Sequence, residues 1–186
     1  MIPRLALLAL AFLALPAAAW DLDRLMQDLA RNSGGKARFV EKKYIALLDK
    51  PVQSAGELSY TAPDRLEKRT LQPKPETLVL DRDVLTVERG KQKFTLRLAE
   101  QPEAQAFVDS IRGTLAGDRR ALERSYALFL AGSEEKWTLS LLPSDQRIAA
   151  LVSRITIGGS RNRVLTVEYL QADGDRAVMS IEPEGK

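Results

Sequence analysis

Residues 56–71 read GELSYTAPDRLEKRTL, and this stretch decides the fold class. Side chains alternate on both sides of Pro63-Asp64, which predicts two strands, 56–62 and 65–71, joined by a tight turn. Turn-forming residues separate this pair from its neighbours, so we expect a meander of antiparallel strands. The other segments with the same period of two are 37–48, 77–80, 84–88 and 93–98.

Two segments follow a helical period instead. Residues 20–32 predict one amphipathic N-terminal helix that ends before Gly34-Gly35. In the segment 101–124, Phe107, Ile111 and Leu115 mark one helical face at intervals of four residues. Gly117 ends that helix, and Asp118 is placed to cap a second short one.

Strand periodicity returns in the last third of the chain. We predict hairpin turns at Gly158-Gly159 and at Asp173-Gly174-Asp175, because the first lacks the following helix of a phosphate loop and the second lacks the distant glutamate of a calcium loop. The predicted fold class is α+β, with one large antiparallel sheet that must curl or close to bury one face. The five predicted strands here are 126–130, 136–142, 151–157, 163–170 and 176–181.

The chain opens with Arg4, an apolar run at 5–15 and small residues up to Ala19. This order is typical of a cleavable secretory signal peptide, since a membrane span needs about 20 apolar residues. An uncleaved helical anchor is the alternative. We expect residues 1–19 to be removed and residues 20–186 to form a single domain, soluble in a bacterial periplasm, where a cysteine-free chain folds by core packing alone.

The 186 residues include no cysteine and no histidine, and the formal net charge is +3. This composition excludes disulfides and Cys–His or Ser–His nucleophile pairs. The carboxylate pairs Glu134-Glu135 and Asp81/Asp83 lie in polar turns, without the burial that acid–base catalysis needs. We therefore predict no catalytic residue, no metal site and no cofactor. The mild positive charge does not indicate nucleic-acid binding.

Three pieces of the chain resemble the LolA-type periplasmic carrier family. Residues 56–67 match that family's G-x-L-x-y-x-x-P-x-x-l/f strand–turn–strand. Residues 37–42, ARFVEK, are similar to its a-x-F-x-q-k first strand, and residues 76–81, ETLVLD, to its e-x-l-v-x-d-g strand. The order of a signal peptide, one helix, a meander, mid-chain helices and further strands matches as well.

The resemblance implies an unclosed half-barrel whose mid-chain helices form a lid over an apolar cavity. In that family the cargo is triacylated lipoprotein, taken from an inner-membrane transporter and given to an outer-membrane receptor. Two departures stand out, because Ala62 replaces an arginine before the motif proline and Lys68-Arg69 replace a common aromatic residue. They favour a divergent relative whose cargo is another lipid, such as a glycolipid or a polyene-type acyl product.

We therefore predict a monomeric, non-enzymatic carrier that shields the acyl chains of a lipoprotein or lipid. Its expected partners are an inner-membrane donor transporter and an outer-membrane acceptor. The alternative is an envelope sensor or scaffold that binds a protein partner on the curved sheet without transporting anything. Basic pairs fit a solvated surface, or contact with lipid phosphates or an acidic partner at a cavity rim; they are Lys42-Lys43, Lys68-Arg69 and Arg119-Arg120.

A soluble acyl carrier needs an apolar lining, because each CH₂ left in water costs about 0.8 kcal/mol. The more apolar parity of each strand supplies the candidates, and plain core packing is the alternative at every one of them. The predicted lining residues are Leu58, Tyr60, Leu66, Leu78, Leu80, Phe94, Leu96, Trp137, Leu139, Leu141 and Val167, with Leu98, Leu165 and Tyr169 added by the same alternation. The predicted lid stripe, which fills the cavity when cargo is absent, is Phe107, Ile111 and Leu115.

Overall fold

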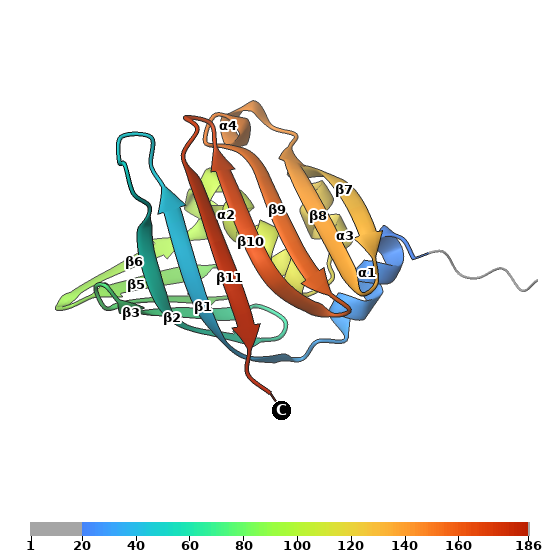
Figure 1. Cartoon of the computed structure of the whole chain (residues 1–186), viewed down its shortest axis with the longest axis horizontal. Coiled ribbons are helices and arrows are strands. Elements are labelled where there is room, and N and C mark those ends of the chain that lie inside the picture. The colour runs from blue at the N-terminus through green and yellow to red at the C-terminus, as the bar shows by residue number, and fades with distance from the viewer. Residues whose placement is uncertain (1–19, 186) are drawn as a thin grey trace, which may run out of the picture.

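A single antiparallel sheet of eleven strands bends around a concave face and does not close (Figure 1). The computed structural model describes residues 20–185. The predicted signal peptide, residues 1–19, lies outside the described residues. Across residues 20–185, none of the helices combines the length and apolar character needed to cross a membrane.

The predicted order of helices and strands is confirmed. The helices are α1 (Leu22–Ala30), α2 (Pro102–Leu115), α3 (Arg119–Glu123) and α4 (Gln146–Ala149), with one 3-10 turn, η1 (Leu98–Glu100). The strands are β1 (Gly34–Tyr44), β2 (Val52–Thr61), β3 (Arg65–Gln72), β4 (Glu76–Asp81), β5 (Val84–Arg89), β6 (Gln92–Arg97), β7 (Tyr126–Ser133), β8 (Lys136–Pro143), β9 (Val152–Ser160), β10 (Arg163–Gln171) and β11 (Arg176–Pro183).

The sheet consists of two meanders joined side by side. Strands β1 to β6 pair in sequence order, as do β7 to β11, and β1 pairs with β11 to join the two meanders. Strands β6 and β7 are the two edges, so within residues 20–185 the barrel stays open between them. The predicted α+β class and the unclosed half-barrel implied by the family resemblance are therefore both confirmed.

The hydrophobic core lies under the helices, on the concave face of β7 to β11. The apolar face of α1 contributes Leu25 and Leu29, which are completely buried. They belong to the same cluster as Trp137 of β8, whose indole N–H donates to the carbonyl of Arg161 at 2.9 Å. Burial of a large aromatic side chain with its polar atom satisfied makes this half of the sheet the well-packed part of the fold.

Small residues let the helices pack closely. Gly117 follows α2 with a φ of +63°, and a Cβ there would lie 2.1 Å from the carbonyl oxygen of Met26 in α1. A Cβ at Gly113 of α2 would lie 2.9 Å from Leu122 of α3. The predicted cap is confirmed, since the Asp118 carboxylate accepts from the N–H of Ala121.

The predicted hairpin turn at Gly158-Gly159 is wrong. Strand β9 continues through both glycines to Ser160, and the turn falls at Arg161, whose φ is +53°. Gly159 serves packing instead, because a Cβ there would lie 2.3 Å from the indole ring of Trp137. The predicted turn at Asp173-Gly174-Asp175 is confirmed between β10 and β11.

Two smaller differences affect the predicted lining. Leu98 does not extend β6, because it begins η1 and is fully buried there. Leu165 lies at a shift of the β9–β10 register between Val164 and Thr166, where simple alternation fails. Helix α4 follows Pro143-Ser144 and was not predicted, since its four residues are too few to show a helical period.

Candidate functional site

Strand register divides the concave face into two halves with different surroundings. We call β1 and β7 to β11 the covered half, because α1 and α3 pack on it, and β2 to β6 the open half. The structure places Tyr169 of β10 in the covered half, partly buried against the core cluster. Four other predicted lining residues in this half belong to the cluster itself, and none of them is more than 5% exposed. These four are Trp137, Leu139, Leu141 and Val167.

The other seven predicted lining residues lie together on the concave face of the open half. Cross-strand pairing forms two rows, because directly paired residues point to the same side of a sheet. The first row is Tyr60, Leu66, Leu80, Leu85 and Leu96. The second row is Leu58, Lys68, Leu78, Val87 and Phe94.

Sequence reasoning missed three members of these rows. Leu85 and Val87 alternate in β5 with the polar Thr86 and Glu88, and that pattern was the available signal. The third missed member, Lys68, lies two residues after Leu66 in β3, and this spacing places both on the same face of the strand. Exposure varies along the rows, from 3% at Leu80 to 55% at Phe94.

The convex face of the open half is mainly polar, although Val79 of β4 and Val84 of β5 also lie on it. Glu57, Glu67 and Arg69 occupy the alternate positions of β2 and β3, and Thr77, Thr86 and Thr95 those of β4 to β6. A half of a sheet with a polar convex face and an apolar concave face usually buries the concave face against another group, and bulk water does not fill it.

Helix α2 carries the predicted lid stripe across the concave side. The ring of Phe107 packs on the ring of Tyr169 in β10, with 4.5 Å between centroids, and still leaves Phe107 41% exposed. Ile111 contacts the core cluster, and Leu115 is partly buried. The helix therefore seats on the covered half through part of its stripe.

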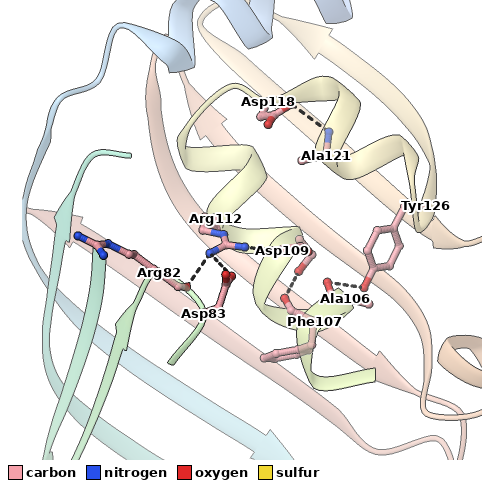
Figure 2. Close-up of polar contacts among 10 residues, drawn as sticks. Arg82, Asp83, Ala106, Phe107, Asp109, Arg112, Asp118, Ala121 and Tyr126 are labelled. Carbon is pink, nitrogen blue, oxygen red and sulfur yellow. Dashed lines mark hydrogen bonds and ion pairs between the residues drawn. The ribbon is translucent and has the colours of Figure 1, made fainter. Parts of the chain in front are cut away.

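The other side of α2 is held by polar contacts, which Figure 2 shows. The guanidinium of Arg112 donates to the carbonyl of Arg82 at 2.7 Å and lies 3.5 Å from the carboxylate of Asp83, both in the β4–β5 turn. It also donates to Asp109 on its own helix at 2.6 Å. Arg112 thus ties α2 to a turn of the open half, and α2 bridges the two halves of the sheet.

A second tie fixes the start of α2. The hydroxyl of Tyr126, at the beginning of β7, donates to the carbonyl of Ala106 at 3.1 Å (Figure 2). Burial, with a smaller contribution from the charge of Asp109, raises the pKa of Tyr126 to about 12. The phenol is therefore a neutral hydrogen-bond donor at all physiological pH values.

Two of the surface cavities in residues 20–185 are bordered by segments other than the α2–open half contact. One, of about 390 Å³, is bordered by α1 and the α2–α3 turn, including Met26 and Arg119. The other, of about 340 Å³, lies over β1 to β3 beside Lys36 and Glu67 and has a mostly polar lining. Among the described residues no cluster of three or more carboxylates could hold a metal ion.

The fold and this concave face together define an open antiparallel half-barrel with a helical cover. A family model described as "Outer membrane lipoprotein carrier protein LolA-like" matches residues 14–180, and the chain belongs to that family. The family resemblance found in residues 37–81 is thereby confirmed for nearly the whole chain. The family's description is of a carrier, not of an enzyme.

Several solved structures align with most of this chain. A LolA superfamily protein from Nitrosomonas europaea is 8% identical, with a TM-score of 0.45 and coverage of 90% of this chain and 96% of that one. A putative outer membrane lipoprotein-sorting protein domain from Vibrio parahaemolyticus is 10% identical, with a TM-score of 0.41 and coverage of 86% and 88%. A chain of the Pseudomonas aeruginosa MucA/MucB complex is 15% identical, with a TM-score of 0.47 and coverage of 89% of this chain and 58% of that one. No curated protein matches the sequence.

Proposed function

We propose that this protein is a periplasmic carrier that shields the acyl chains of a lipoprotein or lipid and passes them from the inner to the outer membrane. One observation carries the proposal. Two rows of mainly leucine side chains cover the concave face of the open half, and Phe94 there is 55% exposed. Leucine side chains adapt to a disordered hydrocarbon, because they lack the stiffness of β-branched residues.

The energy of shielding explains why such a face is needed. A sixteen-carbon chain costs on the order of 10 kcal/mol when it is left in water. A carrier must recover most of that free energy by apolar contact and must still release the chain at its destination. Release is easiest when an internal group takes the place of the cargo, so that the empty site is never fully exposed to water.

Helix α2 supplies that replacement group in our proposal. Phe107 and Ile111 cover part of the concave face, while Arg112 ties the helix to the β4–β5 turn through polar contacts. Water can replace polar contacts of this kind at low cost, because the guanidinium and the carbonyl each form hydrogen bonds to water after they separate. Cargo then binds along the open half when α2 moves away from the β4–β5 turn.

The rest of the proposal concerns processing and partners. The signal peptide is cleaved after Ala19, and residues 20–186 act as a single, non-catalytic, monomeric domain. Cargo comes from a donor transporter in the inner membrane and goes to an acceptor in the outer membrane. Ala62, which replaces the family arginine before the motif proline, lies exposed in the β2–β3 turn. Ala62 has no charged side chain that could take part in passing cargo to an acceptor, which favours a cargo other than triacylated lipoprotein.

Two measurements test the carrier proposal. Native mass spectrometry of the full-length gene product, purified from a periplasmic fraction, should show an acyl-bearing adduct. In parallel, the uncharged dye N-phenyl-1-naphthylamine should bind in an apolar site and fluoresce. A protein with an apo mass and no dye binding would contradict the proposal.

A matched pair of variants locates the site. Phe107→Ser removes an aromatic ring that is 41% exposed on the lid, and Phe129→Ser removes one that is 56% exposed on the convex face of β7. We expect the first to change dye affinity at least threefold and the second to leave it unaltered. Equal effects of the two would place the dye outside the concave face.

A protein-binding scaffold is the second candidate, and one observation favours it. In residues 20–185, strand β7 is an edge of the sheet, and the exposed Phe129 on it shares the convex face with Leu142 of β8, which is 38% exposed. An exposed edge with apolar side chains can accept a strand from a partner. A scaffold would have an apo mass and would lose partner capture with Phe129→Ser, and Phe107→Ser would not affect that capture.

A further inference from the structure

An ion pair lies on the concave face, among the leucine rows. The ammonium of Lys68 in β3 is 2.8 Å from the carboxylate of Glu41 in β1, and their side chains are only 26% and 8% exposed. Ser54 of β2 also donates to that carboxylate, at 3.3 Å. We call Glu41 and Lys68 the anchor pair.

The motif glycine makes the anchor pair possible. Strand β2 separates β1 from β3, and Gly56 pairs with Phe39 in the strand register. A Cβ at Gly56 would lie 3.0 Å from the ring of Phe39, so the ring extends over β2 where a side chain would otherwise stand. The ammonium of Lys68 lies 4.9 Å from the centroid of that ring. A carboxylate and an aromatic face together fix the position of Lys68.

Packing alone gives little reason for this pair. The direct neighbours of Lys68 across the register are Leu58 on β2 and Leu78 on β4. Charges among such side chains carry a desolvation cost that an apolar pair of similar volume avoids. The ammonium has three donors, of which Glu41 accepts one contact, and its partial exposure leaves it accessible to another acceptor.

The lid helix covers the neighbourhood of the anchor pair. Phe107 of α2 packs on Tyr169 of β10, as described above. Strand register places Glu41 in β1 and Tyr169 in β10 on the same face, on the two strands that flank β11. Burial, followed by the negative charge of Glu41, raises the pKa of Tyr169. Movement of α2 would therefore remove Phe107 from Tyr169 and open this side of the anchor carboxylate.

We propose that Lys68 binds the anionic headgroup of the cargo, a carboxylate or a phosphate carried directly on an acyl chain that lies along the leucine rows. Glu41 is the internal acceptor that holds the ammonium in place while the site is empty. The inference depends on the carrier function proposed above and narrows its cargo to acidic amphiphiles. The two residues of the anchor pair should have opposite effects on headgroup affinity, since Lys68 attracts the headgroup and Glu41 competes with it for the ammonium.

The test compares ligands that share a chain and differ in charge. Dodecanoate, dodecyl phosphate and uncharged 1-dodecanol would each displace N-phenyl-1-naphthylamine from the purified protein, below their micellar concentrations. A charge-assisted hydrogen bond at a partly buried site corresponds to about a tenfold preference. We expect at least one acidic ligand to bind about tenfold more tightly than 1-dodecanol.

Variants then assign that preference to Lys68. Lys68→Met should abolish it and Lys68→Arg should retain it, while Glu41→Gln should increase it because the competing carboxylate is gone. Arg69→Met is the matched control, since it removes one positive charge from the next residue, on the convex face. If Lys68→Met folds poorly with Glu41 unpaired, the double variant Lys68→Met/Glu41→Gln removes both charges and should also lack the preference.

The outcomes separate this inference from the carrier function. Equal binding of all three ligands, or a preference that survives in the double variant, overturns the anchor while leaving the carrier intact. Inorganic phosphate that competes as well as dodecyl phosphate identifies a free anion as the ligand and also overturns it. Failure of every amphiphile to bind overturns both proposals.

Discussion

Arg112→Lys gives the sharpest test of helix α2 as a lid. Lysine keeps a positive charge beside Asp109 but cannot reproduce the fork through which Arg112 also reaches the carbonyl of Arg82. The variant therefore weakens the tie to the β4–β5 turn and preserves the pair within α2.

The expected magnitude follows from the contacts that are lost. A hydrogen bond with a charged donor contributes about 1.5–3 kcal/mol, and this one is partly exposed, so we take about 1.5 kcal/mol. The Asp83 carboxylate is 67% exposed and 3.5 Å away, and such pairs contribute little. A loss of about 1.5 kcal/mol corresponds to roughly tenfold more frequent opening of α2.

Hydrogen–deuterium exchange measures that opening directly. The amides of α2 should exchange about tenfold faster in Arg112→Lys, while those of β8 and β9 keep their protection. Arg65→Lys is the control, because it alters an exposed arginine that pairs with Asp81 within the β3–β4 hairpin and does not contact α2. Unchanged exchange in α2, or equal acceleration in β8 and β9, would refute the reasoning.

Three other predictions concern stability and the open half. Tyr126→Phe should lower the free energy of unfolding by about 1 kcal/mol, because it removes the buried bond to α2. Since the folded pKa of Tyr126 is raised from 10 to about 12, its contribution is complete below pH 10 and declines as the pH rises toward 12. Urea titrations at several pH values should show a smaller decline in the variant than in the parent, because only Tyr60 and Tyr169, whose pKa values are also raised, still contribute to it. Gly159→Ala should destabilise the fold by about 2 kcal/mol or more, because the new Cβ would clash with Trp137. Gly35→Ala is the control, since no atom lies within 4 Å of the new Cβ, and it should leave the thermal denaturation almost unchanged. Phe94→Ser should weaken dye binding severalfold with little change in melting temperature, and a large drop in melting temperature would mean that Phe94 belongs to the core.

Local sequence patterns predicted most of the fold. Alternation in residues 56–71 predicted β2 and β3 because most of their convex side chains are polar and most of their concave ones, Lys68 excepted, are apolar. The same reasoning failed at Gly158-Gly159, since a pair of glycines has the same sequence signature in a turn and under a tryptophan ring. Only the position of Trp137 on the neighbouring strand distinguishes the two.

The candidate site was only partly predictable. Alternation assigns residues to one face of a strand, and it cannot tell which part of that face the helices cover. Leu139 and Leu78 were therefore predicted alike, although Leu139 is completely buried in the core and Leu78 lies in the open half. The anchor pair joins residues 27 positions apart across an intervening strand, and no short-range pattern reports such a pairing.

The pairing of β1 with β11 has a consequence for how the molecule assembles. Strand β1 pairs with β2 on one side and with β11 on the other. The strand pair at the middle of the sheet therefore joins residues that are far apart in the sequence. Contacts of that kind form late, because closing a long loop must precede any gain from them. During synthesis the two meanders thus stay unjoined until residues 176–183 have been made, and a truncation before β11 would leave them as separate, marginal halves.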